Sequence, residues 1–582
     1  MKNVNQDTPK NPKPRKPLRL WPGAVIALLQ WFMWYLIPKL SSGGTALAIS
    51  VFGGMIGGLA VIVWWAFFSR APRPERWTAI LLMLLTLIAM PFFADASIKT
   101  GLAGMMYYVY AVPVLSISFV VWALISQQFS AKLRTLAMIF TILIASGIWI
   151  LLRSNGISSN ASAEFEWRWA ISDEERLMTS SGEEFIKYSA ITETKAAWPG
   201  FRGPNRDGIV HGLKIQTNWQ STPPTEIWRR PVGPGCSSFS SRGGLLYTQE
   251  QLGEDELVSC YQLSTGKPVW KHHDKARFWD SHAGAGPRST PTLHDSLVIT
   301  LGATGILNVL KAVDGDKIWS QNAATELGID PPGWGFASSP LVVDTVVIVA
   351  VSGKLIAYDL SDGTSLWVGP DGGENYSSPQ LFTIDGVKQV LMMSAVATTS
   401  FDPIDGKILW EYPWEAGAII QPAITPAGDI LISEGYKKGV HSLSVSFNAG
   451  DWTIDEHWMT TKIRPDFNDF VIHKGYLYGF EGSSLTCVDL KDGSRKWKEG
   501  QYGGQLLLIA DQDLLLVISE KGELVLAEAS PEQFTELAFY KAIEGKTWNH
   551  PIIVDDILLV RNTSEMAAFR LSRLEDITMK TN

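Results

Sequence analysis

The hydrophobic positions divide this chain of 582 residues into two parts of different character. Residues 20–152 are almost continuously apolar and contain five runs of about 17 to 25 residues, each long enough to cross a hydrocarbon layer of about 30 Å. We place these runs at 20–37, 43–68, 77–93, 105–125 and 135–152. Because backbone amides in lipid must bond within their own segment, the pattern predicts five transmembrane helices.

Basic residues flank alternate ends of these runs and predict their orientation. The tail 1–19 is basic, Arg70, Arg73 and Arg76 follow the second run, and Lys132 and Arg134 follow the fourth. The positive-inside rule then puts the tail in the cytoplasm and everything after the fifth run outside it. We therefore expect a multi-pass protein of the bacterial inner (plasma) membrane with a periplasmic C-terminal part. A cleaved signal peptide does not fit, since the first run is long and four more follow.

Residues 153–197 are polar and acidic and predict a linker with one short helix. Ser172 precedes Glu174 and Glu175, a typical helix start in which carboxylates lie near the positive end of the helix dipole. From 198 to 582 the pattern changes to short apolar runs separated by turn residues, as in a β-rich domain.

One short phrase recurs through this last part of the chain. It reads TGKPVW, DGDKIW, DGTSLW, DGKILW and DGSRKW, with a glycine four residues before a tryptophan in all five copies. The pairs are Gly266 and Trp270, Gly315 and Trp319, Gly363 and Trp367, Gly406 and Trp410, and Gly493 and Trp497. Intervals of about 40 to 50 residues are typical of propellers and solenoids. Glycine supplies the positive φ of a tight turn, and we expect the tryptophan to pack against the turn of a neighbouring unit.

Each phrase closes a unit of four short strands, and eight units can be drawn. Their first strands begin near Cys236, Arg288, Ala337, Ser377, Ile420, Asn468, Gly503 and Asn549. The segment around Thr225–Trp228 precedes the first unit and is expected to supply the last unit's missing outer strand, which closes the ring and removes open sheet edges. The predicted fold is an all-β eight-bladed propeller of four-stranded antiparallel blades, preceded by an all-α bundle of five transmembrane helices.

These repeats, of the form AxDxxDGxxxW with SSP-like strand starts, resemble the tryptophan-docking motif of the PQQ-repeat superfamily of eight-bladed quinoprotein propellers. The resemblance covers about residues 198–571, and WPGFRGPNRDG at 198–208 resembles the opening of PQQ-binding-like propeller proteins. Membrane-bound quinoprotein glucose dehydrogenases have the same five spans and external propeller; this resemblance implies pyrroloquinoline quinone (PQQ), Ca²⁺ and sugar or alcohol oxidation feeding membrane quinone. The BamB family of propeller lipoproteins has short loops and no cofactor, and that resemblance implies partner proteins.

Blade size separates these two hypotheses. Eight blades over residues 198–571 leave about 45 residues each, enough for four strands and short turns but not for loops that roof a cofactor.

The three cysteines, Cys236, Cys260 and Cys487, include no adjacent pair and no CxxC, so we expect neither a disulfide framework nor a cysteine metal site. A net charge of −8 gives no reason to expect nucleic acid. We expect a non-catalytic binding or scaffold module for proteins or glycans outside the cytoplasm; the alternative is a PQQ- and Ca²⁺-dependent dehydrogenase.

The loops that lead into the innermost strands should meet at the mouth of the ring. They offer the arginine, aromatic platform and oxygen donors that a quinone with three carboxylates and a hard cation require. The candidate residues are Arg288, Trp334, Glu374, Asn375, Trp414, Asp469, Trp548 and His550. A polar, water-filled mouth is the alternative interpretation of each, and the sequence assigns no catalytic residue.

Overall fold

The computed structural model describes residues 18–574 except 41–43, 159–162, 180–183, 189–194, 416 and 435–437. The chain forms two compact units, one of Met1–Asn155 with Ala163–Trp169 and the other of Gly156–Ser162 with Ala170–Asn582.

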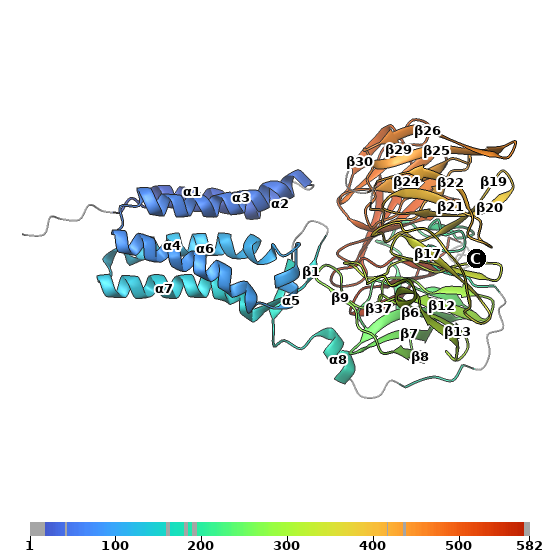
Figure 1. The fold of residues 1–582 in the computed structure, drawn as a ribbon, viewed down its shortest axis with the longest axis horizontal. Helices are drawn as coiled ribbons and strands as arrows, with labels where there is room; N and C mark the ends of the chain where they lie inside the picture. Colours follow the sequence, from blue (N-terminus) through green and yellow to red (C-terminus); the bar gives the residue numbers. More distant parts are fainter. Residues whose placement is uncertain are drawn as a thin grey trace, which may run out of the picture. The chain divides into compact units, whose positions relative to one another are not determined.

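The first unit is a helical bundle (Figure 1). Five of its described helical segments are long and apolar enough to cross a membrane: Trp21–Leu40, Ala46–Phe68, Arg73–Phe92, Met106–Gln128 and Ala131–Leu151. They contain α1 (Trp21–Trp31), η1 (Phe32–Leu36), α2 (Ile37–Leu40), α3 (Gly44–Val63), η2 (Trp64–Phe68), α4 (Arg73–Ala89), η3 (Met90–Phe92), α6 (Met106–Ile125), η4 (Ser126–Gln128), α7 (Ala131–Gly147) and η5 (Ile148–Leu151), and α5 (Ala96–Thr100) is a short connecting helix. The five-helix prediction is confirmed. The third helix begins four residues before the predicted 77, because a proline in its first turn is preorganised for helix.

Small residues let α3 pack closely between two other helices. A side chain added at Gly57 would overlap Gln30, with a Cβ 2.5 Å from its Cγ, and one added at Gly58 would overlap Val112 of α6. The Gln30 amide also donates to the Gly54 carbonyl at 2.7 Å. The GGMIGG run at 53–58 is thus the contact surface of α3 toward both neighbours, which is how closely packed membrane helices use glycine.

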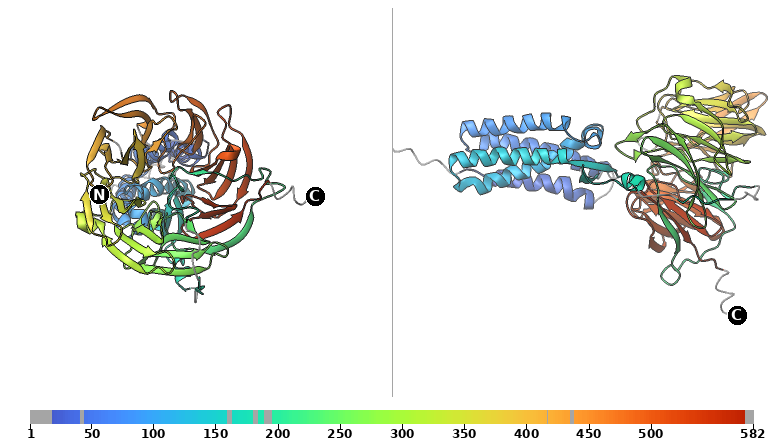
Figure 2. Two further views of the ribbon diagram at one scale, coloured as in Figure 1. Left: turned by 90° about the vertical axis from the view of Figure 1, so that its right-hand side faces the viewer. Right: turned by 90° about the horizontal axis from the view of Figure 1, so that it is seen from below.

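The second unit is an eight-bladed propeller of four-stranded antiparallel sheets, as predicted (Figure 2). Blades 1 to 4 are β5 (Ser240–Arg242), β6 (Leu245–Leu252), β7 (Asp255–Gln262), β8 (Pro268–Asp274); β11 (Thr292–His294), β12 (Leu297–Leu301), β13 (Ile306–Lys311), β14 (Lys317–Asn322); β15 (Leu341–Val343), β16 (Val346–Val351), β17 (Lys354–Asp359), β18 (Ser365–Val368); and β19 (Gln380–Ile384), β20 (Val387–Met393), β21 (Ala397–Phe401), β22 (Ile408–Pro413). Blades 5 to 8 are β23 (Ala423–Ile424), β24 (Ile430–Glu434), β25 (Gly439–Asn448), β26 (Asp451–Thr460); β27 (Val471–His473), β28 (Tyr476–Glu481), β29 (Ser484–Asp489), β30 (Arg495–Glu499); β31 (Gly504–Ile509), β32 (Leu514–Ser519), β33 (Glu523–Glu528), β34 (Glu536–Lys541); and β35 (Ile552–Val554), β36 (Ile557–Arg561), β37 (Glu565–Arg570), β4 (Thr225–Pro231).

The ring closes within blade 8, where the last strands of the chain meet an early one. β4 pairs antiparallel with β37, with Trp228 opposite Ala568. First strands of neighbouring blades, such as β5 with β11 and β11 with β15, contact one another and line the ring centre. β3 (Ile209–Val210) pairs parallel with β31 and adds a fifth strand to blade 7. Short elements outside the blades are β1 (Leu152–Ile157), β2 (Ala163–Trp167), β9 (Trp279–Asp280), β10 (Gly284–Ala285), α8 (Asp173–Thr179), α9 (Ala323–Leu327) and η6 (Ala510–Gln512).

The repeated tryptophans lie between blades. Trp319 of blade 2 packs on Gly363 of blade 3, and its indole N–H donates to the Leu360 carbonyl of that turn at 2.8 Å. The same contact recurs for Trp228 with Gly266, Trp270 with Gly315, Trp367 with Gly406, and Trp458 with Gly493. Trp410 and Trp497 differ, because blades 5 and 7 carry no glycine at the matching place in their outer hairpins. The Trp410 indole N–H donates to Gln389 of its own blade at 2.6 Å, and the Trp497 indole N–H donates to the Ser530 carbonyl of blade 7 at 2.8 Å.

Candidate functional site

Residues 198–210, here called the plug, run through the centre of the ring. They contact the first strand of every blade or the residues that lead into it. The partners, from blade 1 to blade 8, are Ser241, Leu293, Ser339 with Pro340, Gln380, Gln421, Asp469 with Phe470, Leu508, and His550. The sequence pattern marks this segment only as the opening of the repeat region. The segment contains two arginines and three glycines and does not match the repeat pattern of any blade. This composition was the signal in the sequence that the segment has a role of its own.

Arg202 is the buried centre of the plug. Its guanidinium bonds to the Asp469 carboxylate at 3.3 Å, to the Asp207 carbonyl at 2.9 Å and to the Phe470 carbonyl. Burial alone would raise the pKa of Asp469, but Arg202 and His550 outweigh it and hold that pKa below its usual value. Burial lowers the pKa of His550, so its imidazole is neutral near pH 7. The plug and blades 6 and 8 are thus joined by a buried, compensated ion pair.

Arg206 joins the other side of the plug to the ring. Its guanidinium donates to the Pro340 carbonyl at 3.0 Å and to the Ser339 carbonyl at 3.2 Å in blade 3, and to Gln421 of blade 5 at 3.4 Å. Burial and the nearby Arg202 lower the pKa of Arg206 to about 10, which leaves it charged at neutral pH. The ring centre therefore holds two guanidinium groups of the chain itself.

The predicted mouth residues fall into different environments. Arg288 is buried and ion-paired with Asp280, and it also donates to the Trp334 carbonyl at 3.2 Å. Asp469 and His550 lie against the plug, as described above. Asn375 is buried, and its side-chain oxygen accepts from the Ser377 amide at 2.7 Å at the start of blade 4.

Trp414 belongs to the hydrophobic core between blades 4 and 5. It is 2% exposed, and its ring meets His441 edge-on at a centroid distance of 4.7 Å. Packing therefore accounts for this residue, which sequence reasoning had grouped with the mouth.

Five half-buried rings and one lysine from five interblade loops form a continuous line, here called the mouth belt: Phe467, Trp548, Lys546, His282, Trp334 and Tyr376. Neighbouring ring centroids lie 4.9 Å apart for Phe467 with Trp548, 6.0 Å for His282 with Trp334, and 4.9 Å for Trp334 with Tyr376. Lys546 lies 4.1 Å from the Trp548 ring centroid and donates to the His282 carbonyl, so it bridges the two aromatic groups. The sequence offered these residues separately; the structure brings them together.

A carboxylate accepts a hydrogen bond from one ring of each aromatic pair in the mouth belt. The Tyr376 hydroxyl donates to Glu374 at 2.5 Å, and the Trp548 indole N–H donates to Glu520 at 2.7 Å. Burial lowers the pKa of His282, so its imidazole is neutral near pH 7, and burial lowers the pKa of Lys546 as well. The belt thus combines aromatic surface with hydrogen-bond donors and acceptors that are already held in place by contacts within the chain.

PQQ and Ca²⁺ do not fit the residues present. Within the described ranges, no group of three or more His, Cys, Asp and Glu side chains is placed to hold a metal ion. Arg288 and Asp469, the predicted carboxylate and cation partners, are each already ion-paired inside the chain, with Asp280 and Arg202. The ring centre, above which the quinone would sit, contains the plug.

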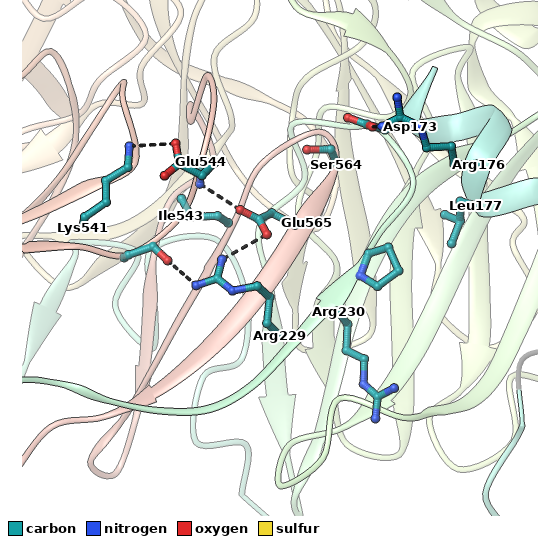
Figure 3. Close-up of a pocket in the computed structure, with 12 residues that line it drawn as sticks. Asp173, Arg176, Leu177, Arg229, Arg230, Lys541, Ile543, Glu544, Ser564 and Glu565 are labelled. Carbon is teal, nitrogen blue, oxygen red and sulfur yellow. Dashed lines mark hydrogen bonds and ion pairs between the residues drawn. The ribbon is translucent and has the colours of Figure 1, made fainter. Parts of the chain in front are cut away.

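A separate groove lies beside α8 and the outer edge of blade 8 (Figure 3). Its volume is about 860 Å³, and Leu177, Pro231 and Ile543 supply apolar surface. Several charged side chains of its walls pair among themselves, as Arg229 does with Glu565 at 3.0 Å. The helix α8 begins after Ser172, whose hydroxyl accepts from the amide three residues on at 3.1 Å.

Comparison with known proteins relates the propeller to one family. Residues 254–499 match the family described as "Outer membrane protein assembly factor BamB". Over 371 residues, 59% of this chain and 87% of the relative, the chain is 24% identical to the outer membrane protein assembly factor BamB of Shewanella oneidensis. Among solved structures, BamB from Moraxella catarrhalis has a TM-score of 0.39 at 12% identity, covering 60% of this chain and 98% of its own. A quinohemoprotein alcohol dehydrogenase from Comamonas testosteroni has a TM-score of 0.48 at 12% identity, covering 65% and 81%.

Proposed function

We propose that this chain, a BamB-like PQQ-repeat propeller joined to five apolar helices, is a membrane-anchored binding module that works outside the cytoplasm and does not oxidise substrates. The observation that carries the proposal is the plug. It fills the ring centre with the chain's own residues and contacts all eight blades.

Displacing the plug would cost a ligand part of its binding free energy. Separating Arg202 from Asp469 would leave a buried charge without its partner, which costs about 3 to 5 kcal/mol. The plug also loses its carbonyl acceptors in blades 3 and 6 if it leaves. A propeller closed in this way is a rigid frame that presents its loops and edges, which is what a binding module requires.

The likeness to BamB supports a partner outside the cytoplasm, since the relatives are named as assembly factors for outer membrane proteins. The basic loops at Arg70–Arg76 and Lys132–Arg134 support the same orientation. We propose an inner-membrane location with the propeller in the periplasm, and a protein or a glycan as the ligand.

A cofactor titration tests the non-catalytic proposal. The full-length chain in detergent is mixed with PQQ and Ca²⁺, and cofactor absorbance and dye reduction with sugars and alcohols are measured beside an active quinoprotein dehydrogenase. We expect neither stoichiometric cofactor nor dye reduction. Stoichiometric PQQ together with dye reduction would refute the proposal.

Location and partner are tested separately. In a variant lacking the native cysteines, D451C in the propeller should react with a membrane-impermeant maleimide in cells whose outer membrane is permeabilised, whereas K132C should react only after lysis. The reverse pattern would refute the orientation. For the partner, a photo-crosslinking residue at Trp279, which is 39% exposed, should give defined adducts that the same residue at Phe539 on the outer strand β34 does not.

A further inference from the structure

We propose that the mouth belt binds a neutral oligosaccharide by stacking its sugar rings on the aromatic side chains. This inference deepens the proposed binding function and rests on it. The belt joins side chains from the loops between blades 1 and 2, 2 and 3, 3 and 4, 5 and 6, and 7 and 8, so it extends over several loops of the ring rather than a single one.

The aromatic rings supply the apolar half of such a site. A pyranose ring has a face of C–H groups, which packs against an aromatic face by dispersion and by removal of both surfaces from water. The belt offers two platforms, Trp334 with Tyr376 and Trp548 with Phe467. They lie on either side of Lys546 and His282, where the chain's own Ile157 bonds to both residues. Two platforms in series match a chain of at least two sugar units better than a single small molecule.

The polar groups of the belt suit hydroxyl groups. A sugar hydroxyl both donates and accepts, so its site needs acceptors and donors close to the apolar platform. Glu374 lies at the Tyr376 hydroxyl, Glu520 at the Trp548 indole N–H, and the neutral His282 imidazole lies between them. Each stacking platform therefore has a carboxylate at its edge.

The charges of the belt favour a neutral ligand over an anionic one. The belt and its immediate partners contain two carboxylates, Glu374 and Glu520, and one amine, Lys546, while Arg288 is ion-paired with Asp280. Like charges brought together at low dielectric repel, so a polyanion would be disfavoured here. The same argument sets this ligand apart from a quinone with three carboxylates.

The platforms are held in place before a ligand arrives. Arg288 donates to the Trp334 carbonyl at 3.2 Å, and the Tyr376 hydroxyl accepts from the Trp334 amide at 3.3 Å. Gln505 donates to the Trp548 carbonyl at 3.0 Å and to the Phe467 carbonyl at 3.2 Å. A preordered surface loses less entropy on binding, which favours affinity for a flexible sugar chain.

Calorimetric titration of the full-length chain tests the proposal. The chain is kept in nanodiscs of lipids without sugar headgroups, because maltoside detergents would compete for the site. The probes are cellotetraose, maltotetraose and chitotetraose, with the anionic tetragalacturonate as the charged counterpart. We expect at least one neutral probe to bind with a Kd below about 1 mM, and tetragalacturonate to bind at least about tenfold more weakly.

Two variants locate the binding. W334A and W548A should each lower the affinity for the neutral probe at least about tenfold. W334F should retain most of that affinity. F539A, which removes an exposed ring outside the belt, should leave the affinity unchanged. Unchanged near-ultraviolet circular dichroism and unfolding midpoints show that each variant is folded. Absence of binding by all neutral probes up to about 10 mM, equal binding of tetragalacturonate, or indifference to W334A and W548A would overturn the proposal.

A protein ligand gives a different result. If a crosslinker at Trp279 gives protein adducts that W334A abolishes, the belt binds a protein. That result would overturn the glycan inference and leave the proposed binding function intact. Stoichiometric PQQ with dye reduction would overturn the binding function itself.

Discussion

Replacing Gly363 by alanine tests how the blades hold one another. The residue has a φ of +75°, and a Cβ added there would lie 2.7 Å from two carbon atoms of the Trp319 indole in the preceding blade. Gly386 is a matched control, because its φ is +82° and nothing lies within 4 Å of the position that a Cβ would take. The two substitutions share the conformational penalty and differ only in the contact with tryptophan.

The expected losses of stability follow from the conformational penalty and from the contact with the Trp319 indole. An alanine at positive φ costs about 1 to 2 kcal/mol, which both variants bear. Overpacking at a filled contact costs a further 1 to 3 kcal/mol, roughly, and weakening the bond between the Trp319 indole and the Leu360 carbonyl adds about 0.5 to 1.5 kcal/mol. G363A should therefore destabilise the propeller by about 2 kcal/mol more than G386A.

Urea unfolding of the detergent-solubilised chain, followed by near-ultraviolet circular dichroism, measures the difference. A double-mutant cycle sharpens it: in a W319L background the smaller side chain leaves room, so G363A should there cost no more than G386A. Equal destabilisation by G363A and G386A within about 0.5 kcal/mol, with no coupling to W319L, would refute the packing argument.

Three further outcomes follow from the structure. R202M should lower stability by about 3 to 5 kcal/mol near pH 7 and by less near pH 4.5, because without Arg202 burial raises the pKa of Asp469, and the carboxyl group can then be neutral in the variant at the lower pH; denaturant unfolding at both pH values measures this, and an equal loss at each would contradict it. Burial raises the pKa of Glu256 from 4.5 to about 7, so this residue should make the native chain lose stability as pH rises from 4.5 to about 7, and E256Q should remove that loss; parallel pH dependences of the two unfolding midpoints would count against this. G58L should loosen the helical bundle in a dodecyl-sulfate unfolding series, whereas G147L, at a position with nothing within 4 Å, should not; equal effects would speak against close packing of α3.

Some of the candidate site was accessible from sequence and some was not. The sequence identified the interblade loops as the mouth and named Trp334, Glu374 and Trp548, which the structure finds in or beside the mouth belt. It could not separate these from Trp414, whose loop continues into the core between two blades. Nor could it show that Asp469 is engaged by Arg202, since the two lie 267 residues apart in the chain. Whether a loop residue faces outward or packs inward depends on neighbours contributed by other blades.

The sequence by itself determined the architecture. The apolar runs, each long enough to cross a membrane, predicted the five helices. Five copies of the glycine-to-tryptophan spacing predicted the eight blades, and an early strand segment predicted the closure of the ring by β4. These are local or periodic properties, which the chain repeats with each unit. Only the tertiary structure decided what fills the ring. The plug occurs once, follows no period, and takes its partners from all eight blades, so its role exists only when strands distant in sequence are brought around it.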